Sequence, residues 1–263
     1  MQKFSGLAGW LARKTPLPGY SVLNERVPDA EAGGFVGIDI ATPVHEVHAL
    51  TAESLSGSWH AVRAYVNEAC KIIGSDEPGW LDREEVTMIK EGLGDPPPQA
   101  YPIYFISAGS GADERLVYIG KTSAKKSRFQ GGHAALARLH APKYDGLKKT
   151  LYMGTIVLLD DIDYLPIEWI SPLEKAERLL SAIEAQLIFD FQPELNTHHR
   201  DRFNAEWQTP INIENHSGFS EFLHGEASYG PAGVPAKTPI WSADARSPPA
   251  TDSAFTVFRS RNA

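Results

Sequence analysis

The hydrophobic pattern predicts a β-hairpin near the middle of the chain. Residues 101–107 and 115–120 are rich in aromatic and β-branched side chains, and residues 108–114 between them have the composition of a loop. A tight turn there would place Tyr104 opposite Tyr118, on one side of the sheet. Two facing phenols are either a packing pair or two groups that contact one ligand, and the hairpin alone favours the packing pair.

Longer patterns predict the other secondary structure elements. Apolar residues that recur every three to four positions indicate helices, and short runs of β-branched residues indicate strands. We therefore expect helices at residues 58–73, 82–91, 133–140 and 172–192, the last with Ser171 as its N-cap, and further strands at residues 35–40 and 151–159.

Glu184 borders the apolar stripe of the last predicted helix. It stands four residues after Leu180 and four before Ile188, so its carboxylate is expected at the edge of the core. A carboxylate in that position needs a positively charged partner. A metal ion and a lysine or arginine side chain both qualify, and the helix alone does not choose between them.

The chain is predicted to divide at residues 95–98, an extended connector with three prolines. Residues 225–253 are rich in Gly, Pro, Ala and Ser, so we expect them to be flexible. The segment from Phe255 to Phe258 is apolar and could dock on this chain or on another. The predicted regions are a mainly helical accessory region at 1–95, a domain at 101–200 and a C-terminal extension at 201–263.

The composition is that of an ordinary soluble protein. The 263 residues are 42% hydrophobic and 22% charged, which suits one large or two small domains. Cys70 is the only cysteine, which excludes an internal disulfide and a cysteine zinc cluster. The apolar runs are shorter than a membrane span, and residues 7–12 are too short for the apolar region of a signal peptide, so we expect neither element. We therefore expect a cytoplasmic protein with no membrane partner.

Positive charge is concentrated in residues 115–149. This stretch has nine basic residues and one acidic residue, in a chain whose formal net charge is −8. A solvated helical face normally mixes the two signs, so the pattern favours contact with a polyanion such as DNA. A lysine-rich surface with no partner would show the same pattern. The basic residues are Arg115, Lys121, Lys125, Lys126, Arg128, Arg138, Lys143, Lys148 and Lys149.

Between residues 101 and 196 the chain has a tyrosine, a Tyr-x-Gly motif, an arginine, a glutamate and an asparagine, in that order. This order resembles that of the GIY-YIG nuclease superfamily. Residues 102–104 stand for the first motif, with Pro102 in place of its glycine, and residues 118–120 stand for the second. The resemblance covers residues 101–196. It matches three further positions: the catalytic arginine at Arg128, the metal-binding glutamate at Glu184 and the asparagine that closes the domain at Asn196.

The resemblance implies a site that hydrolyses phosphodiester bonds. Glu184 would hold one divalent ion, Mg²⁺ or Mn²⁺, whose coordination is completed by water and phosphate. Arg128 would bind the phosphate. Tyr104 would orient or deprotonate the attacking water, with the hydroxyl of Tyr118 in support, and the charge of Lys121 would favour the phenolate.

The remaining candidates have secondary roles. His133 lies near the position of a histidine in several family members. Gly120 would allow a close backbone approach at the strand end, and Asn196 would tie the chain after the last helix to the site. Contacts with nucleic acid are expected from Lys125, Lys126, Arg138, Lys143, Lys148 and Lys149.

These observations define one main expectation and two alternatives. The expected fold is α/β (α+β), a small three-stranded antiparallel sheet flanked by helices, with a mainly helical N-terminal region and a loose C-terminal tail. The expected function is a metal-dependent endonuclease that acts on DNA. One alternative is a nucleic-acid-binding module that keeps the fold without cleavage. The other is an assembly protein, forming homo-oligomers or binding a protein partner through the N-terminal region or residues 255–258.

Overall fold

The computed structural model describes residues 11, 28, 32–50, 53–76, 79–122, 134–159, 164–200, 203 and 208–232. The strands are β1 (Gly34–Pro43), β2 (Ile103–Ala108), β3 (Arg115–Lys121), β4 (Lys149–Leu159), β5 (Tyr164–Pro166), β6 (Ile211–Asn215) and β7 (Ala227–Ser228). The α-helices are α2 (Leu55–Ile73), α3 (Arg83–Leu93), α4 (Ala134–Arg138) and α5 (Leu173–Phe191). Short 3-10 helices include η2 (Val44–Ala49), η3 (Gly111–Asp113), η4 (Pro142–Tyr144), η5 (Ile167–Trp169) and η6 (Gly230–Ala232).

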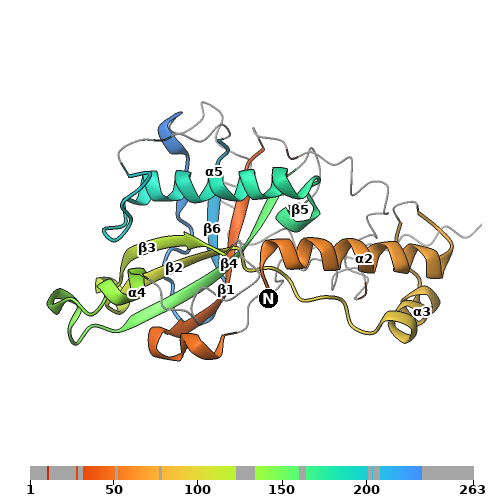
Figure 1. Cartoon of the computed structure of the whole chain (residues 1–263), viewed down its shortest axis with the longest axis horizontal. Helices are drawn as coiled ribbons and strands as arrows, with labels where there is room; N and C mark the ends of the chain where they lie inside the picture. Colours follow the sequence, from red (N-terminus) through yellow and green to blue (C-terminus); the bar gives the residue numbers. More distant parts are fainter. Residues whose placement is uncertain are drawn as a thin grey trace, which may run out of the picture.

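These strands form one mixed sheet of seven strands (Figure 1). Its order is β3-β2-β4-β1-β6-β7, with β5 paired to β4, and only the β1–β6 pair is parallel. The predicted three-stranded sheet is therefore wrong as a description of the fold. The three expected strands β2, β3 and β4 are antiparallel neighbours, but they are only part of the seven-stranded sheet of an α+β fold.

The length and burial of β4 explain why the sheet is larger. This strand has 11 residues, and all but its two end residues are buried. A strand buried so completely needs neighbours on both edges, because unpaired backbone groups in a core are costly. β2 pairs with the first half of β4, and β5 pairs with its last three residues. β1 pairs with β4 over its whole length, from Gly34 to Pro43. The sheet thus draws strands from residues before 95 and after 200 as well as from the middle of the chain.

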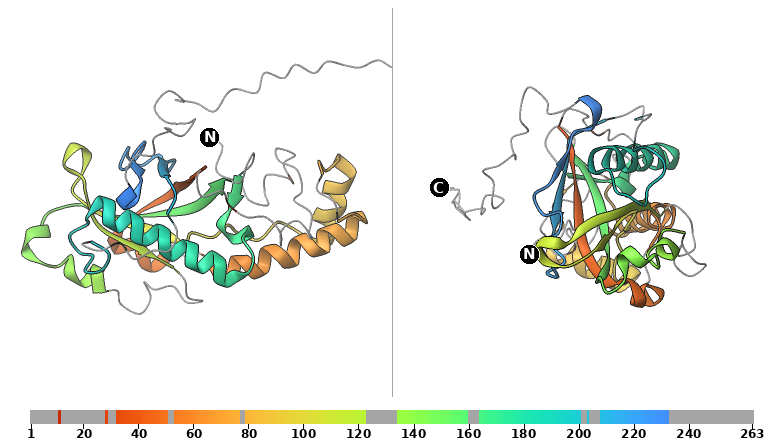
Figure 2. Two further views of the ribbon diagram at one scale, coloured as in Figure 1. Left: turned by 90° about the horizontal axis from the view of Figure 1, so that it is seen from above. Right: turned by 90° about the vertical axis from the view of Figure 1, so that its left-hand side faces the viewer.

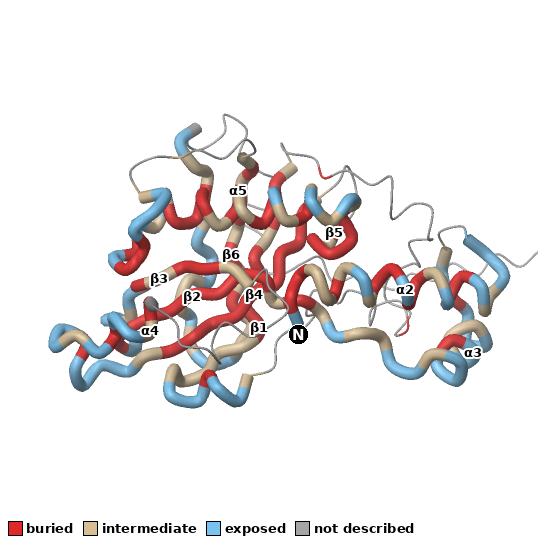
Figure 3. The backbone as a smooth tube through the Cα atoms, in the orientation of Figure 1, coloured by how far each residue is buried: buried red, intermediate tan, exposed pale blue. Residues whose placement is uncertain are grey.

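Two apolar cores lie on opposite faces of the sheet, as the alternation of side chains along a strand requires. The larger core joins Phe105 and Ile119 to α2 and α5. The smaller core joins Tyr104 and Val117 to residues of η2, α4 and η4. Figure 2 shows α5 lying along the sheet, and Figure 3 shows burial along the strands and mostly exposed residues on α3.

The β2–β3 hairpin is present, but its register differs from the prediction. Tyr104 pairs with Gly120, and Tyr118 pairs with Ile106. The register shifts between Ile106 and Ser107, and the connection contains the helical turn η3. A bulge of this kind adds a residue to one strand, which a symmetric turn model cannot anticipate.

The predicted helices before the hairpin are found with small changes at their ends. Helix α2 begins after Ser54, whose hydroxyl accepts a hydrogen bond from Gly57 N–H, and it ends at Gly74 in the left-handed conformation. Helix α3 begins with a reciprocal capping box between Asp82 and Glu85. The two helices extend away from the sheet (Figure 1).

Candidate functional site

The two motif tyrosines lie together on the face of the sheet that carries the smaller core. The ring centroids of Tyr104 and Tyr118 are 6.0 Å apart, with 31° between the ring planes. They are diagonal rather than direct neighbours, because Tyr104 pairs with Gly120. Tyr104 is fully buried, whereas Tyr118 is half-buried. Tyr118 is thus the phenol with exposed surface.

Gly120 makes room for the Tyr104 ring. A Cβ atom at position 120 would lie 2.4 Å from the Tyr104 hydroxyl oxygen and 2.8 Å from the ring of Tyr118. Both distances are below any ordinary contact, and the rings are held in the core. A side chain at this position would therefore displace the tyrosine pair, which gives the glycine of the second motif a steric reason.

Lys121, Glu184 and Ser181 form a polar cluster on the other face of β3. Lys121 Nζ lies 3.2 Å from Glu184 Oε2 and donates to Ser181 Oγ at 2.7 Å. The Lys121 side chain is 24% exposed and that of Glu184 16%. The partner of Glu184 in this structure is therefore a lysine, and the position of Glu184 at the core edge is as the apolar stripe predicts.

The two groups meet at the C-terminal end of β3. Gly120 lies beneath the tyrosines, and the next residue, Lys121, contacts α5 on the opposite face, as strand alternation requires. The structure thus brings Tyr104, Tyr118 and Gly120 into one group and Lys121 and Glu184 into another, one residue apart along an edge strand. Ser181 was not a predicted site residue, although its spacing of three from Glu184 places both on one helix face.

The segment after α5 fixes the outer edge of β3. The Asn196 side chain accepts from Ile119 N–H at 2.9 Å and donates to Ile119 C=O at 2.8 Å. Leu195 N–H donates to Val117 C=O at 2.9 Å. These contacts hold the backbone on both sides of Tyr118. Asn196 has the geometry that a structural role requires.

The described basic residues of the 115–149 run are partly engaged within the chain. Lys143 forms an ion pair with Glu194, whose other oxygen accepts from the Tyr144 hydroxyl at 2.6 Å. The Glu194 contact raises the pKa of Lys143, and the Lys143 contact lowers the pKa of Glu194. The guanidinium of Arg138 donates to Leu195 C=O at 3.0 Å.

Lys148 and Lys149 lie at the start of β4. Lys148 is exposed and its Nζ lies 4.0 Å from the ring centroid of Phe219. Lys149 is half-buried. Four other predicted residues fall outside the described part of the chain, so the structure does not place them: Lys125, Lys126, Arg128 and His133.

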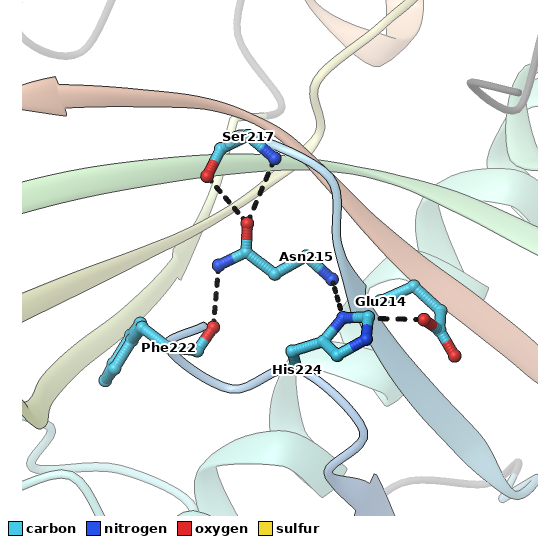
Figure 4. Close-up of polar contacts among 5 residues, drawn as sticks. All are labelled: Glu214, Asn215, Ser217, Phe222 and His224. Carbon is cyan, nitrogen blue, oxygen red and sulfur yellow. Dashed lines mark hydrogen bonds and ion pairs between the residues drawn. The ribbon is translucent and has the colours of Figure 1, made fainter. Parts of the chain in front are cut away.

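The exposed Phe219 belongs to a turn after β6, where the sequence predicts a helical turn at residues 219–223. Asn215 organises this turn (Figure 4): its side chain donates to Phe222 C=O at 2.7 Å and accepts from the Ser217 hydroxyl at 2.7 Å. Its N–H donates to His224 Nδ1 at 3.0 Å, and Glu214 Oε2 lies 3.6 Å from the same nitrogen. The turn is thereby fixed by its own polar groups.

The turn also packs on the sheet. The Phe222 ring stacks on Tyr152 with centroids 4.9 Å apart, and the Tyr152 hydroxyl donates to Glu114 at 2.6 Å. Burial and the bond to Glu114 raise the pKa of Tyr152. These contacts place an aromatic side chain beside Lys148, at the end of the sheet where the basic run begins.

Among the described residues, no group of three or more His, Cys, Asp or Glu side chains could hold a metal ion. Among those residues, a metal ion at Glu184 would therefore have fewer than three such protein ligands. Comparison with protein-family models, curated proteins and solved structures finds no match to this chain. In the part of the chain that the structure describes, no helix is both long and apolar enough to cross a membrane.

Proposed function

We propose that this chain is a metal-dependent endonuclease that cleaves DNA in the cytoplasm, with its active site at the C-terminal end of β3. The observation that carries the proposal is the Gly120–Lys121 step. It joins a tyrosine pair, 6.0 Å between ring centroids, to a lysine and a carboxylate 3.2 Å apart. Phosphodiester hydrolysis needs an oriented water, positive charge near the phosphate and help for the leaving oxygen.

The donor atoms at Glu184 suit a hard cation. Glu184 and Ser181 present oxygen atoms from one helix face, and both side chains are half-buried. Mg²⁺ is commonly bound through one or two carboxylates, with water and substrate phosphate filling the other positions. Glu184 would hold one Mg²⁺ or Mn²⁺ ion, which when bound stabilises charge on the phosphate oxygens. The small donor set fits an ion that completes its coordination with substrate.

The other site residues act on the water and the phosphate. Tyr118 has exposed surface, so it contacts substrate directly. Tyr104 is buried beneath it, so its hydroxyl reaches the attacking water only when neighbouring chain moves aside. Lys121 supplies positive charge to the phosphate. Arg128, assigned by the resemblance, binds the phosphate with its planar guanidinium.

The contact with DNA extends from the active site toward the start of β4. Lys148 lies there beside Phe219, and Lys149 follows it as the first residue of β4, both in the basic run of residues 115–149. Basic side chains of this kind bind phosphates without reading the sequence. Lys143 and Arg138 are engaged with Glu194 and Leu195, so they contribute less than their charge suggests.

Incubation of the pure protein with supercoiled plasmid and Mg²⁺ or Mn²⁺ tests the proposal. We expect nicked and linear DNA from the wild type and none from Glu184→Gln. Glu174→Gln is the matched control, because it makes the same change at an exposed position of α5. Binding of DNA without cleavage would favour the silent binding module. Neither binding nor cleavage would favour the assembly protein.

A further inference from the structure

The ammonium group of Lys121 contacts two acceptor oxygen atoms, Ser181 Oγ and Glu184 Oε2. The Ser181 hydroxyl donates its own proton to Glu177 C=O at 2.8 Å. Its oxygen can therefore only accept from Lys121 Nζ, which lies 2.7 Å away. Glu184 Oε2 is the second acceptor, at 3.2 Å from the same Nζ. Two acceptors from one helix thus converge on a single cationic atom.

An ammonium and a divalent ion cannot both use these oxygens. Mg²⁺ binds oxygen at about 2.0–2.1 Å, far inside the observed N–O distances, and the two cations repel each other. The Lys121 and Glu184 side chains are 24% and 16% exposed. Their attraction is therefore screened less than that of a surface pair. A metal ion that takes Glu184 Oε2 and the Ser181 oxygen must therefore displace Lys121.

We propose that Lys121 occupies the cation position of Glu184 and Ser181 in the metal-free protein, so that its ion pair and metal binding are mutually exclusive. This inference rests on the proposed nuclease site and adds a means of regulation. A DNA phosphate gives Lys121 a new anionic partner and frees Glu184. DNA and metal therefore bind cooperatively, and by linkage each raises the affinity of the other by the same factor.

The test measures Mn²⁺ binding to the DNA-free protein by the electron paramagnetic resonance signal of free Mn²⁺. We expect Lys121→Met and Lys121→Gln to bind Mn²⁺ about five-fold more tightly than the wild type, the scale of losing one competing ion pair. Lys90→Met, which removes a charge on the distant exposed helix α3, should leave the affinity unchanged. Glu184→Gln should lose the site. The two Lys121 variants differ in polarity, and circular dichroism shows which of them folds.

A second measurement compares the wild type with and without DNA, with Lys121→Gln as the control. Adding a short duplex with non-hydrolysable linkages should tighten Mn²⁺ binding several-fold, and the gain should vanish in Lys121→Gln. Equal or weaker Mn²⁺ binding by the Lys121 variants would overturn the inference, as would absence of Mn²⁺ binding in both wild type and variants. Plasmid cleavage decides the nuclease proposal separately, because the first Mn²⁺ measurement contains no DNA and the second only a duplex that cannot be cleaved.

Discussion

Glu184 and Glu168 both lie close to the core, but their carboxyl groups have different partners: a lysine ammonium for Glu184 and backbone N–H groups for Glu168. Glu184 faces the ammonium of Lys121 and keeps part of its surface exposed. Glu168, in η5, is 3% exposed, and its carboxyl accepts hydrogen bonds from backbone N–H groups, its own and that of Ala100. Arg63 lies nearby, but its guanidinium donates to the main-chain oxygens of Glu168 and Trp169.

Burial therefore decides the charge of Glu168. Loss of solvent raises the pKa of its carboxyl to about 7, against the backbone hydrogen bonds that lower it. Near neutral pH the group is poised between its neutral and charged forms. A buried carboxylate therefore marks a cation site only where a cation faces its oxygens. Glu168 is more deeply buried than Glu184, yet its position indicates a packing role.

The largest expected effect separates the two glutamates by activity. Glu184→Gln should lower the rate of plasmid cleavage by about 10²-fold or more, because it removes the proposed metal ligand. Glu168→Gln should cleave at the wild-type rate. Single-turnover cleavage at saturating protein measures both. Full activity of Glu184→Gln would end the assignment of Glu184 as the metal ligand.

The next largest effect concerns how the free energy of unfolding depends on pH through Glu168. Folded Glu168 keeps its proton up to about pH 7, whereas the unfolded chain releases it near pH 4.5. Its contribution to stability is therefore full below pH 4.5 and is lost as the pH rises through 7. The loss above that pH is on the order of 3 kcal/mol. Glu168→Gln should abolish this decline.

Urea unfolding at about pH 5 and about pH 8 measures this prediction. At the higher pH, Glu168→Gln should exceed the wild type in unfolding free energy, while Glu174→Gln, at an exposed site, should follow the wild type. Identical pH profiles for Glu168→Gln and wild type would show that the Glu168 carboxyl is already compensated.

A smaller effect tests the role of Arg63. Its Nη atoms donate to buried main-chain oxygens at 2.9 and 3.1 Å, and its guanidinium lies 3.6 Å from the centre of the Trp59 ring. Arg63→Met should lower the unfolding free energy by about 2 kcal/mol through the unpaired oxygens, against less than about 0.5 kcal/mol for the exposed control Arg83→Met. A pH dependence steeper than that of the wild type would identify Arg63 as a charge partner of Glu168.

The smallest effect asks which region faces DNA. Replacement of Lys148 and Lys149 by Gln should flatten the slope of log K against log salt concentration by about two, nearly one for each lost phosphate contact. Fluorescence anisotropy with a labelled duplex measures it. Lys71→Gln and Lys90→Gln, on α2 and α3, provide the matched control. Equal slopes for the two double variants would show that the start of β4 does not contact DNA.

Local pattern was enough for the longer helices and the four longest strands, β1 to β4, but not for the pairing of the strands. The alternation of residues 101–120 predicts both strands of the hairpin, whereas the bulge after Ile106 moves Tyr104 opposite Gly120. The parallel pairing of β1 with β6 joins segments far apart in the sequence. Pairing of that kind depends on long-range packing, which a local pattern does not encode. The seven-stranded sheet was therefore missed.

The candidate site shows the same limit. The apolar stripe of α5 places Glu184 at the edge of the core, and the structure agrees. The same stripe does not show whether the partner of Glu184 is a metal ion or a basic side chain. Lys121 fills that place 63 positions earlier in the chain, and only the packing of α5 against β3 brings the two together.

The contacts of Asn196 have a consequence for association between chains. β3 is a terminal strand of the sheet, and such strands offer a template for pairing with a second molecule. The carboxamide of Asn196 acts as a substitute peptide unit, giving Ile119 the acceptor and donor that a neighbouring strand would offer. Leu195 N–H donates a hydrogen bond to the C=O of Val117, the next outward-facing carbonyl of β3. Asn196 thus protects this edge against sheet-to-sheet polymerisation, and Asn196→Ala should make the protein prone to aggregate although it changes none of the proposed catalytic side chains.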